Sequence, residues 1–166
     1  MIQKKICLMG AFAVGKTSLV ARFVRSVFSE KYHTTLGVKI DKKIVASARG
    51  EVMLMIWDLA GEDEFIGVDL TYMRGAAGYL IVADGTRRAS LERAISLKAR
   101  IDERIGPVPF LLLINKVDLD DAWEIPDSDI EALSMKGWRI LRTSAKTGQG
   151  VEAAFISLAA SLLPPI

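Results

Sequence analysis

The sequence has little cysteine, little net charge and no long apolar run, and each shortage excludes a class of protein. Cys7 is the only cysteine among 166 residues, so no disulfide can form within the chain, and its place inside an apolar run predicts a buried, inert thiol. A formal net charge of +2 is too small to indicate nucleic-acid binding. No apolar stretch approaches the ~18 residues of a membrane span. We therefore expect a protein of the reducing cytoplasm that binds no nucleic acid.

Signals for attachment to a membrane are also missing from the sequence as it stands. The opening residues 1–5 resemble neither a signal peptide nor a myristoylation site, and no cysteine lies near the last residue for prenylation. We expect no direct membrane anchor in this chain, and we expect a monomer.

The length and the hydrophobic pattern indicate one α/β domain over residues 1–166. Apolar residues make up 51% of the chain, and apolar runs alternate with amphipathic helical patterns from end to end. Continuous apolar runs at 5–9, 79–83 and 110–114 are typical of strands buried on both faces of a largely parallel sheet. We expect helices on both faces of that sheet.

Helical stripes and one hairpin complete the predicted fold. Three sets of apolar residues recur at helical spacing and predict core-facing helices: Leu19, Val20, Phe23, Val24 and Val27; Leu91, Ala94, Ile95, Ile101 and Ile105; and Val151, Ala154, Phe155, Leu158, Ala159 and Leu162. Segments 38–46 and 52–57, joined by a turn at 47–50, predict a hairpin that adds one antiparallel edge strand. The Lys and Arg residues between Arg87 and Arg104 are interpreted as a solvated helix face.

Residues Gly10 to Thr17, GAFAVGKT, match the pattern G-x-x-x-x-G-K-[ST] between a predicted strand and a predicted helix. In that context consecutive backbone N–H groups and a helix N-terminus cradle a phosphate chain. Lys16 would reach the β- and γ-phosphates, and the Thr17 hydroxyl would bind Mg²⁺. The segment therefore predicts a nucleotide phosphate site.

A second motif, Asn115-Lys116-Val117-Asp118, indicates which base is bound. It follows the predicted strand at 110–114. The Asp118 carboxylate can accept from the N1–H and the 2-amino group of guanine, whereas adenine offers neither donor there. A site built on such a carboxylate discriminates strongly, because the wrong base leaves a buried charge unpaired. Asp118 therefore favours guanine over adenine.

Two weaker motifs gain weight from their positions. Asp58-Leu59-Ala60-Gly61 offers a carboxylate for Mg²⁺ and a Gly61 N–H for the γ-phosphate, and Thr143-Ser144-Ala145-Lys146 follows a predicted strand at 138–141. Either motif alone is more often an ordinary turn. All of these loops, however, follow strands, and ligands of open α/β sheets bind outside the carboxyl ends of strands.

The combination of these stretches resembles the small GTPases of the Ras superfamily, nearest the Rab branch, over the whole chain. The matching stretches are GAFAVGKT, YHTTLGVK, WDLAGEDEF with the following TYMRGAAGY, INKVD and TSAK. The resemblance implies a P-loop NTPase three-layer sandwich with a six-stranded, mostly parallel sheet. It implies a GTP/GDP switch with Mg²⁺, and effector, exchange-factor and activating proteins that bind through switch loops at 32–37 and 61–73.

The resemblance also implies individual roles. The nucleotide would contact Gly10, Ala13, Val14, Gly15, Lys16, Thr17, Ser18, Phe28, Tyr32, Thr35, Gly61, Asn115, Lys116, Asp118, Ser144, Ala145 and Lys146. Mg²⁺ would be held by Thr17, Thr35 and Asp58, and catalysis would involve Lys16, Thr35, Gly61 and Glu62. The residues alone favour other interpretations for Phe28, which they place in the core, and for Tyr32, which they place on the surface. His33 is interpreted as an exposed loop residue, and Trp57, Trp123 and Trp138 as packing residues.

Two positions depart from the pattern of family members with strong turnover, which have glutamine after D-x-x-G and small residues after the first P-loop glycine. Here those positions hold Glu62 and Phe12. An ionised glutamate accepts hydrogen bonds but cannot donate to the developing γ-phosphate charge, and Phe12 lies where an activating protein's arginine would pass. These departures predict slow hydrolysis, and they leave open a GTP-binding platform with negligible turnover. A Phe12 that points outward and packs on a switch loop without kinetic effect is the other interpretation of that residue. An ATP-dependent phosphotransferase on the same scaffold is disfavoured by Asp118.

Overall fold

Six strands form one sheet in the computed structural model, which describes residues 1–26, 28, 38–59 and 70–165. The strand order is β2-β3-β1-β4-β5-β6. Their bounds are β1 Gln3–Gly10, β2 Val38–Ser47, β3 Gly50–Leu59, β4 Gly78–Asp84, β5 Phe110–Asn115 and β6 Ile140–Thr143. Each predicted strand is therefore present, with ends that differ from the predicted ones by a few residues.

The sheet is parallel except at the edge formed by β2. Strand β1 pairs in parallel with both β3 and β4, and β4, β5 and β6 continue in parallel. Strand β2 runs antiparallel to β3, from Val38 opposite Leu59 to Ser47 opposite Gly50. The predicted hairpin and its antiparallel edge strand are confirmed. The parallel arrangement brings the carboxyl ends of β1, β3, β4, β5 and β6 to one edge of the sheet.

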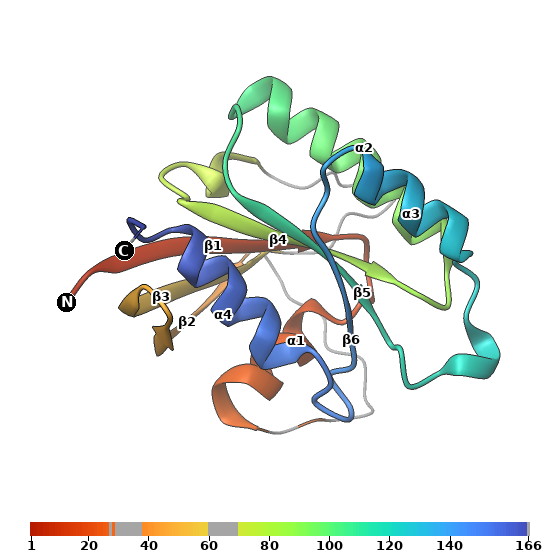
Figure 1. Ribbon diagram of the computed structural model, residues 1–166, viewed down its shortest axis with the longest axis horizontal. Coiled ribbons are helices and arrows are strands. Elements are labelled where there is room, and N and C mark those ends of the chain that lie inside the picture. The colour runs from red at the N-terminus through yellow and green to blue at the C-terminus, as the bar shows by residue number, and fades with distance from the viewer. Residues whose placement is uncertain (27, 29–37, 60–69, 166) are drawn as a thin grey trace.

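Helices cover both faces, as Figure 1 shows with α2 and α3 on one side and α1 and α4 on the other. The helices are α1 Lys16–Arg25, α2 Arg88–Arg104, α3 Asp127–Met135 and α4 Val151–Ser161, with short 3₁₀ turns at Leu70–Met73 and Asp120–Ala122. Apolar residues of α1 and α4 share one buried cluster with the sheet, and those of α2 and α3 share another. The three-layer α/β fold is therefore confirmed.

Some of the predicted helical packing is wrong. Ile95 and Ile105 are 40% and 38% exposed, whereas Leu97 is buried in the core beside Leu91 and Ala94. The buried residues of α2 are Ser90, Leu91, Ala94, Leu97 and Ile101, so Ile95 lies beside the buried stripe and Ile105 follows the end of the helix. Helix α3 was not predicted. Leu133 is its only buried residue, so its sequence shows no apolar periodicity.

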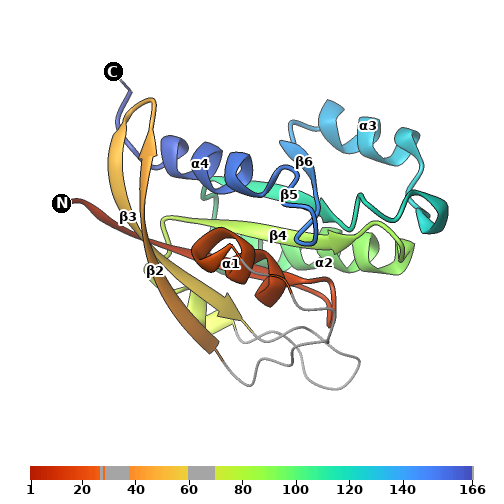
Figure 2. The ribbon, with the colours of Figure 1, turned by 90° about the horizontal axis from the view of Figure 1, so that it is seen from below.

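The hairpin also reaches the last helix. Figure 2 shows the β2–β3 turn beside the end of α4. Arg49, at the tip of the turn, donates through Nη1 to the carbonyls of Ala160 and Leu163, at 3.2 and 3.4 Å. A helix leaves its last carbonyls without intrahelical partners, so this arginine both caps α4 and fixes the hairpin against it.

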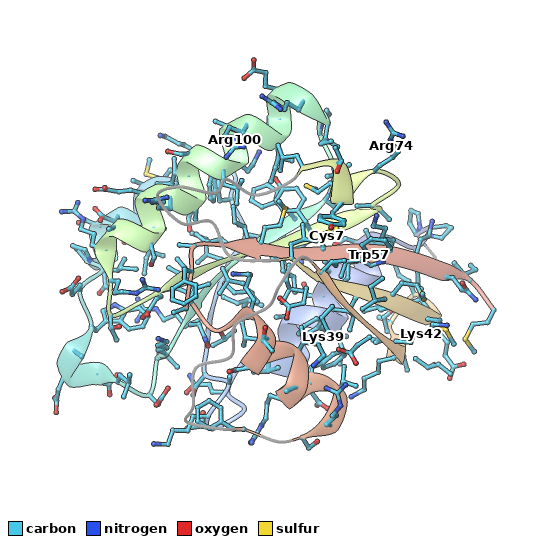
Figure 3. The ribbon with its side chains drawn as sticks, turned by 180° about the vertical axis from the view of Figure 1, so that it is seen from behind. Cys7, Lys39, Lys42, Trp57, Arg74 and Arg100 are labelled. Atoms are coloured by element: carbon cyan, nitrogen blue, oxygen red, sulfur yellow. The ribbon has the colours of Figure 1, made fainter. Side chains whose placement is uncertain are left out.

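Tryptophans and the single cysteine pack as the sequence predicts. Trp57, Trp123 and Trp138 are partly buried and pack against the α2 and α3 side of the core. Cys7 is fully buried in β1, near Trp57 of β3 (Figure 3). Burial raises the pKa of its thiol to about 12, although Lys5 opposes the rise. Among the residues that the structure describes, each helix is too short or too polar to cross a bilayer.

The environment of Cys7 predicts a thiol that reacts slowly in the folded protein. Only the thiolate is nucleophilic, so a pKa near 12 leaves on the order of 10³-fold less thiolate at pH 8 than an unperturbed cysteine would have. We expect a chromogenic disulfide reagent to modify native protein more slowly than unfolded protein by at least that factor. The comparison is made with the same protein in guanidinium chloride. Equal rates would show that Cys7 is accessible.

Candidate functional site

The loop between β1 and α1 requires glycine at both of its ends. A Cβ on Gly10 would lie 2.3 Å from the Val82 carbonyl oxygen of the neighbouring strand, and a Cβ on Gly15 would lie 2.4 Å from the Asn115 Nδ2 atom. Gly15 also has φ +102° and is the N-cap of α1. The first turn of α1 contains no acidic side chain, so nothing in it neutralises the positive end of the helix dipole.

Lys16 folds back over this loop instead of extending into solvent. The side chain is buried, and its Nζ donates to the carbonyls of Gly10 and Ala11 at 3.2 and 3.1 Å. Burial lowers the pKa of Lys16 to about 8, an effect that Asp58 opposes and Arg87 reinforces. An ammonium that burial destabilises gains from an anion placed beside it. The loop is thus electrostatically suited to a phosphate.

Thr17 and Asp58 lie side by side at the start of α1 and near the end of β3. The Thr17 hydroxyl donates to Asp58 Oδ2 at 2.6 Å, and Asp58 is completely buried. Hydroxyl and carboxylate oxygens are the hard ligands that Mg²⁺ prefers, and Mg²⁺ is commonly held by one or two protein groups together with substrate phosphates. In the described part of the chain no group of three or more His, Cys, Asp or Glu side chains could hold a metal ion by itself. The pair fits Mg²⁺ that arrives with a phosphate chain.

The predicted base-binding loop contacts the predicted phosphate loop directly. Asn115 ends β5, and its Nδ2 donates to the Val14 carbonyl at 3.0 Å. Its Oδ1 accepts from the Thr143 hydroxyl at 3.1 Å, which is possible because Asn115 and Thr143 are paired across β5 and β6. The next residue, Lys116, donates through Nζ to the Ala13 carbonyl at 3.3 Å. Three motifs that are far apart in the sequence therefore form one site.

Asp118 is held by the loop that follows β6. The Ser144 hydroxyl donates to Asp118 Oδ1 at 2.7 Å, and the same oxygen of Ser144 accepts from the Thr147 backbone N–H. One carboxylate oxygen is thus engaged by the protein and orients the other. Ala145 is buried, whereas Lys146 is exposed. Phe28 is 36% exposed, so the core position that the residues alone favour is wrong, and its packing on guanine remains a prediction.

The sequence analysis missed two members of the site, Asp84 and Arg87. Asp84 ends β4, is buried, and accepts from Lys116 Nζ at 2.8 Å and from Arg87 Nε at 3.0 Å. Arg87 Nη2 donates to the Phe12 carbonyl at 2.7 Å. Arg87 is therefore not the purely solvated residue that was predicted. The position of Asp84 at the carboxyl end of a buried strand was the signal that could have found it.

Several residues with predicted roles lie outside the described residues: Val27 of the first helical stripe, the exposed loop residue His33, and the site residues Tyr32, Thr35, Gly61 and Glu62. Their roles stay predictions. Of the other predicted residues, Val14 is buried, Ala13 and Ser18 are half-buried, and Ala13 has a left-handed φ of +60°. Phe12, the bulky residue of the loop, has its side chain 48% exposed.

The fold and the meeting of these loops at the carboxyl edge of the sheet define a P-loop nucleotide-binding protein. Comparison with known proteins defines the family. The model of the Ras family matches residues 5–163. The chain is 35% identical to "Ras-related protein Rab-32A" of Dictyostelium discoideum over 162 residues, which cover 90% of this chain and 73% of that protein.

Two further relatives give the same result. Ras-related protein Rab11D of Nicotiana tabacum is 34% identical, with 93% of this chain and 70% of the relative covered. Ras-related protein Rab-13 of Bos taurus is 34% identical, with 96% and 79% covered. The chain belongs to the Ras family of GTP-binding regulatory GTPases, as a Rab-like member.

Proposed function

We propose that residues 1–166 form a single GTPase domain that binds GTP or GDP with Mg²⁺, hydrolyses GTP slowly and changes two loops to control partner binding. The observation that carries the proposal is the convergence of the Thr17–Asp58 pair, the buried Lys16 and the loop 115–118 on one phosphate-binding loop. Lys16 and the backbone N–H groups of the loop bind the phosphates. Thr17, Asp58 and Thr35 would hold Mg²⁺, which when bound would neutralise charge on the phosphate oxygens.

Base selection belongs to Asp118. Ser144 engages one oxygen of this carboxylate, so the other is the acceptor offered to N1–H and the 2-amino group of guanine. The Lys116 side chain is held at the phosphate loop by Ala13 and Asp84, so its stem lies beside the same site. The Ala145 backbone N–H completes the set as a donor to the guanine carbonyl.

The test is a thermal melt with GDP, GTP or ATP, each with and without Mg²⁺. A ligand that binds only the folded state raises the melting temperature in proportion to the logarithm of its excess over Kd. We expect guanine nucleotides with Mg²⁺ to raise it and ATP to leave it unchanged. An equal rise with ATP would favour a phosphotransferase on the same scaffold and would contradict the role of Asp118.

Partner proteins would bind through the loops at 32–37 and 61–73, in the cytoplasm. The described residues beside the first loop support this proposal. Ile40 and Ile44 on β2 are 45% and 50% exposed, and they share one face of the strand with Lys42. The labelled Lys42 and Trp57 mark this region in Figure 3. Exposed apolar side chains next to a nucleotide-sensitive loop are suited to a partner that reads the bound nucleotide.

Slow hydrolysis follows from Glu62 and leads to a specific mutant prediction. An ionised glutamate beside the γ-phosphate adds negative charge and donates no hydrogen bond to the transition state. Glu62→Gln restores a donor, so we expect the single-turnover rate of GTP hydrolysis to rise about tenfold or more. Glu62→Ala is the control and should change the rate little.

The alternative, a GTP-binding platform with negligible turnover, rests on the same residue and on Phe12. It is favoured if wild type and Glu62→Gln both retain GTP unhydrolysed. If Glu62→Gln and Glu62→Ala both abolish turnover, Glu62 is itself a catalytic base and the proposal of slow, glutamate-limited hydrolysis is wrong.

A further inference from the structure

Five successive carbonyls of the phosphate-binding loop accept hydrogen bonds from side chains. Lys16 donates to Gly10 and Ala11, at 3.2 and 3.1 Å, and Asn115 donates to Val14 at 3.0 Å. Between them, Arg87 donates to Phe12 at 2.7 Å and Lys116 donates to Ala13 at 3.3 Å. Four of these bonds come from residues of the nucleotide-binding motifs. The bond to Phe12 comes from Arg87, which belongs to none of them.

A hydrogen bond to a backbone carbonyl also fixes the direction of the N–H group of the next residue, which belongs to the same peptide unit. A trans peptide is planar and places its C=O and N–H on opposite sides, and no cis peptide occurs in the described residues. Holding the Phe12 carbonyl toward Arg87 therefore turns the Ala13 N–H to the opposite side. Lys116 fixes the Val14 N–H in the same way, and Asn115 fixes the Gly15 N–H. These are the amides of the loop that would receive phosphate oxygens.

Arg87 is itself held in place by Asp84. Its Nε donates to Asp84 Oδ2 at 3.0 Å while its Nη2 reaches the Phe12 carbonyl, so two nitrogens of one rigid guanidinium are used at once. Asp84 is 1% exposed and also accepts from the Thr86 backbone N–H and hydroxyl. Burial alone would raise the pKa of Asp84, but the hydrogen bonds from Lys116 and Thr86 outweigh it and keep the pKa below its usual value. The carboxylate is therefore ionised and anchors both cations.

We propose that Arg87 is a positioning residue of the nucleotide site, which, anchored by Asp84, fixes the Phe12–Ala13 peptide so that the Ala13 N–H is preorganised for phosphate. The proposal rests on the proposed function and adds to it a residue outside the nucleotide-binding motifs. Asp84 accepts from Arg87 and from Lys116 through the same oxygen, Oδ2. The base loop and the phosphate loop therefore share one buried anchor.

The positive charge of Arg87 could also attract phosphate directly. Its field reaches the site, because Arg87 is one of the groups that lower the pKa of Lys16, a repulsion between two cations. The side chain is 43% exposed, and solvent weakens that field. The directional bond to Phe12 is therefore the larger contribution, and a lysine at position 87 tests this, because lysine keeps the charge and loses the two-nitrogen fork.

The test compares Arg87→Ala, Arg87→Lys and the control Arg88→Ala. Arg88 is the next residue, is similarly exposed and pairs with Asp129 instead of the loop. Two readouts are used: the dissociation rate of a fluorescent GDP analogue with Mg²⁺, and amide hydrogen exchange of the peptide covering residues 10–16 without nucleotide. We expect both Arg87 variants to release GDP about tenfold faster and to exchange loop amides faster, while Arg88→Ala matches wild type.

The proposal is overturned if Arg87→Ala leaves loop exchange and GDP release at wild-type values. It is also overturned if Arg87→Lys matches wild type in both, because charge alone would then suffice. Hydrogen exchange is measured here without nucleotide, so this readout separates the positioning role of Arg87 from the proposed function. The two hypotheses can fail separately. If wild type fails to bind GDP while Arg87→Ala exchanges its loop amides faster, the proposed function is wrong and the role of Arg87 in positioning the loop is supported.

Discussion

Asp118→Asn is expected to convert guanine recognition into xanthine recognition. The Ser144 hydroxyl donates to Asp118 Oδ1, and an asparagine keeps an oxygen for that bond. The atom offered to the base then changes from a charged acceptor to an NH₂ donor. The donor faces the 2-amino group of guanine unfavourably, whereas xanthine presents a carbonyl at the same place. Two charge-assisted hydrogen bonds are lost, so GDP affinity should fall on the order of 10²- to 10⁴-fold.

The measurement is displacement of a fluorescent nucleotide by GDP and by xanthosine diphosphate. Asp120→Asn is the matched control, because Asp120 is an exposed acid two residues further along the chain and should leave both affinities unchanged. Unchanged GDP affinity in Asp118→Asn would show that this carboxylate does not read the base. Loss of both nucleotides would point instead to collapse of the loop held by Ser144.

Most of the sheet could be predicted from the sequence, because strands buried on both faces leave short, continuous apolar runs. Apart from Lys5, the runs at 5–9, 79–83 and 110–114 are apolar at every position, which is typical of short strands buried on both faces of a sheet. Ile95 was wrongly predicted to lie in the core, because its sequence spacing is the same whether or not the sheet extends far enough to cover it. Helix α3 could not be predicted, because it has one buried residue and a helical periodicity is recognised only from several.

The site shows a similar division. The glycines, Lys16 and Asp118 could be predicted as site residues, because the chemistry expected of them belongs to their side chains or to the lack of one. The role of Arg87 could not, because its partner is the backbone carbonyl of Phe12, and every residue has a carbonyl. The same holds for the contact of Asn115 with Val14. Interactions with backbone atoms depend on where the fold places two loops, and no residue pattern records them.

Gly15→Ala is expected to damage both the stability of the fold and the nucleotide site. The new Cβ would stand 2.4 Å from Asn115 Nδ2, at a residue whose φ of +102° already disfavours any side chain. Asn115 cannot easily move away, because it is 2% exposed and bonded to both Val14 and Thr143. Strain and overpacking together should lower the free energy of unfolding by roughly 2–6 kcal/mol. Displaced Asn115 would release the Val14 carbonyl, so GDP affinity should also fall about 10- to 100-fold.

Gly106→Ala is the control that separates the effect of the Cβ contact with Asn115 from the effect of backbone strain. Gly106 has a similar φ of +98°, but a Cβ there would meet nothing within 4 Å. We expect this control to cost only the ~1–2 kcal/mol of a left-handed non-glycine residue, with unchanged GDP affinity. Urea unfolding of the nucleotide-free proteins measures the first effect, and displacement of a fluorescent nucleotide measures the second. If Gly15→Ala lowers the free energy of unfolding no more than Gly106→Ala does, the Asn115 side chain moves aside without cost. The close contact between the phosphate loop and the base loop would then contribute nothing to holding the site together.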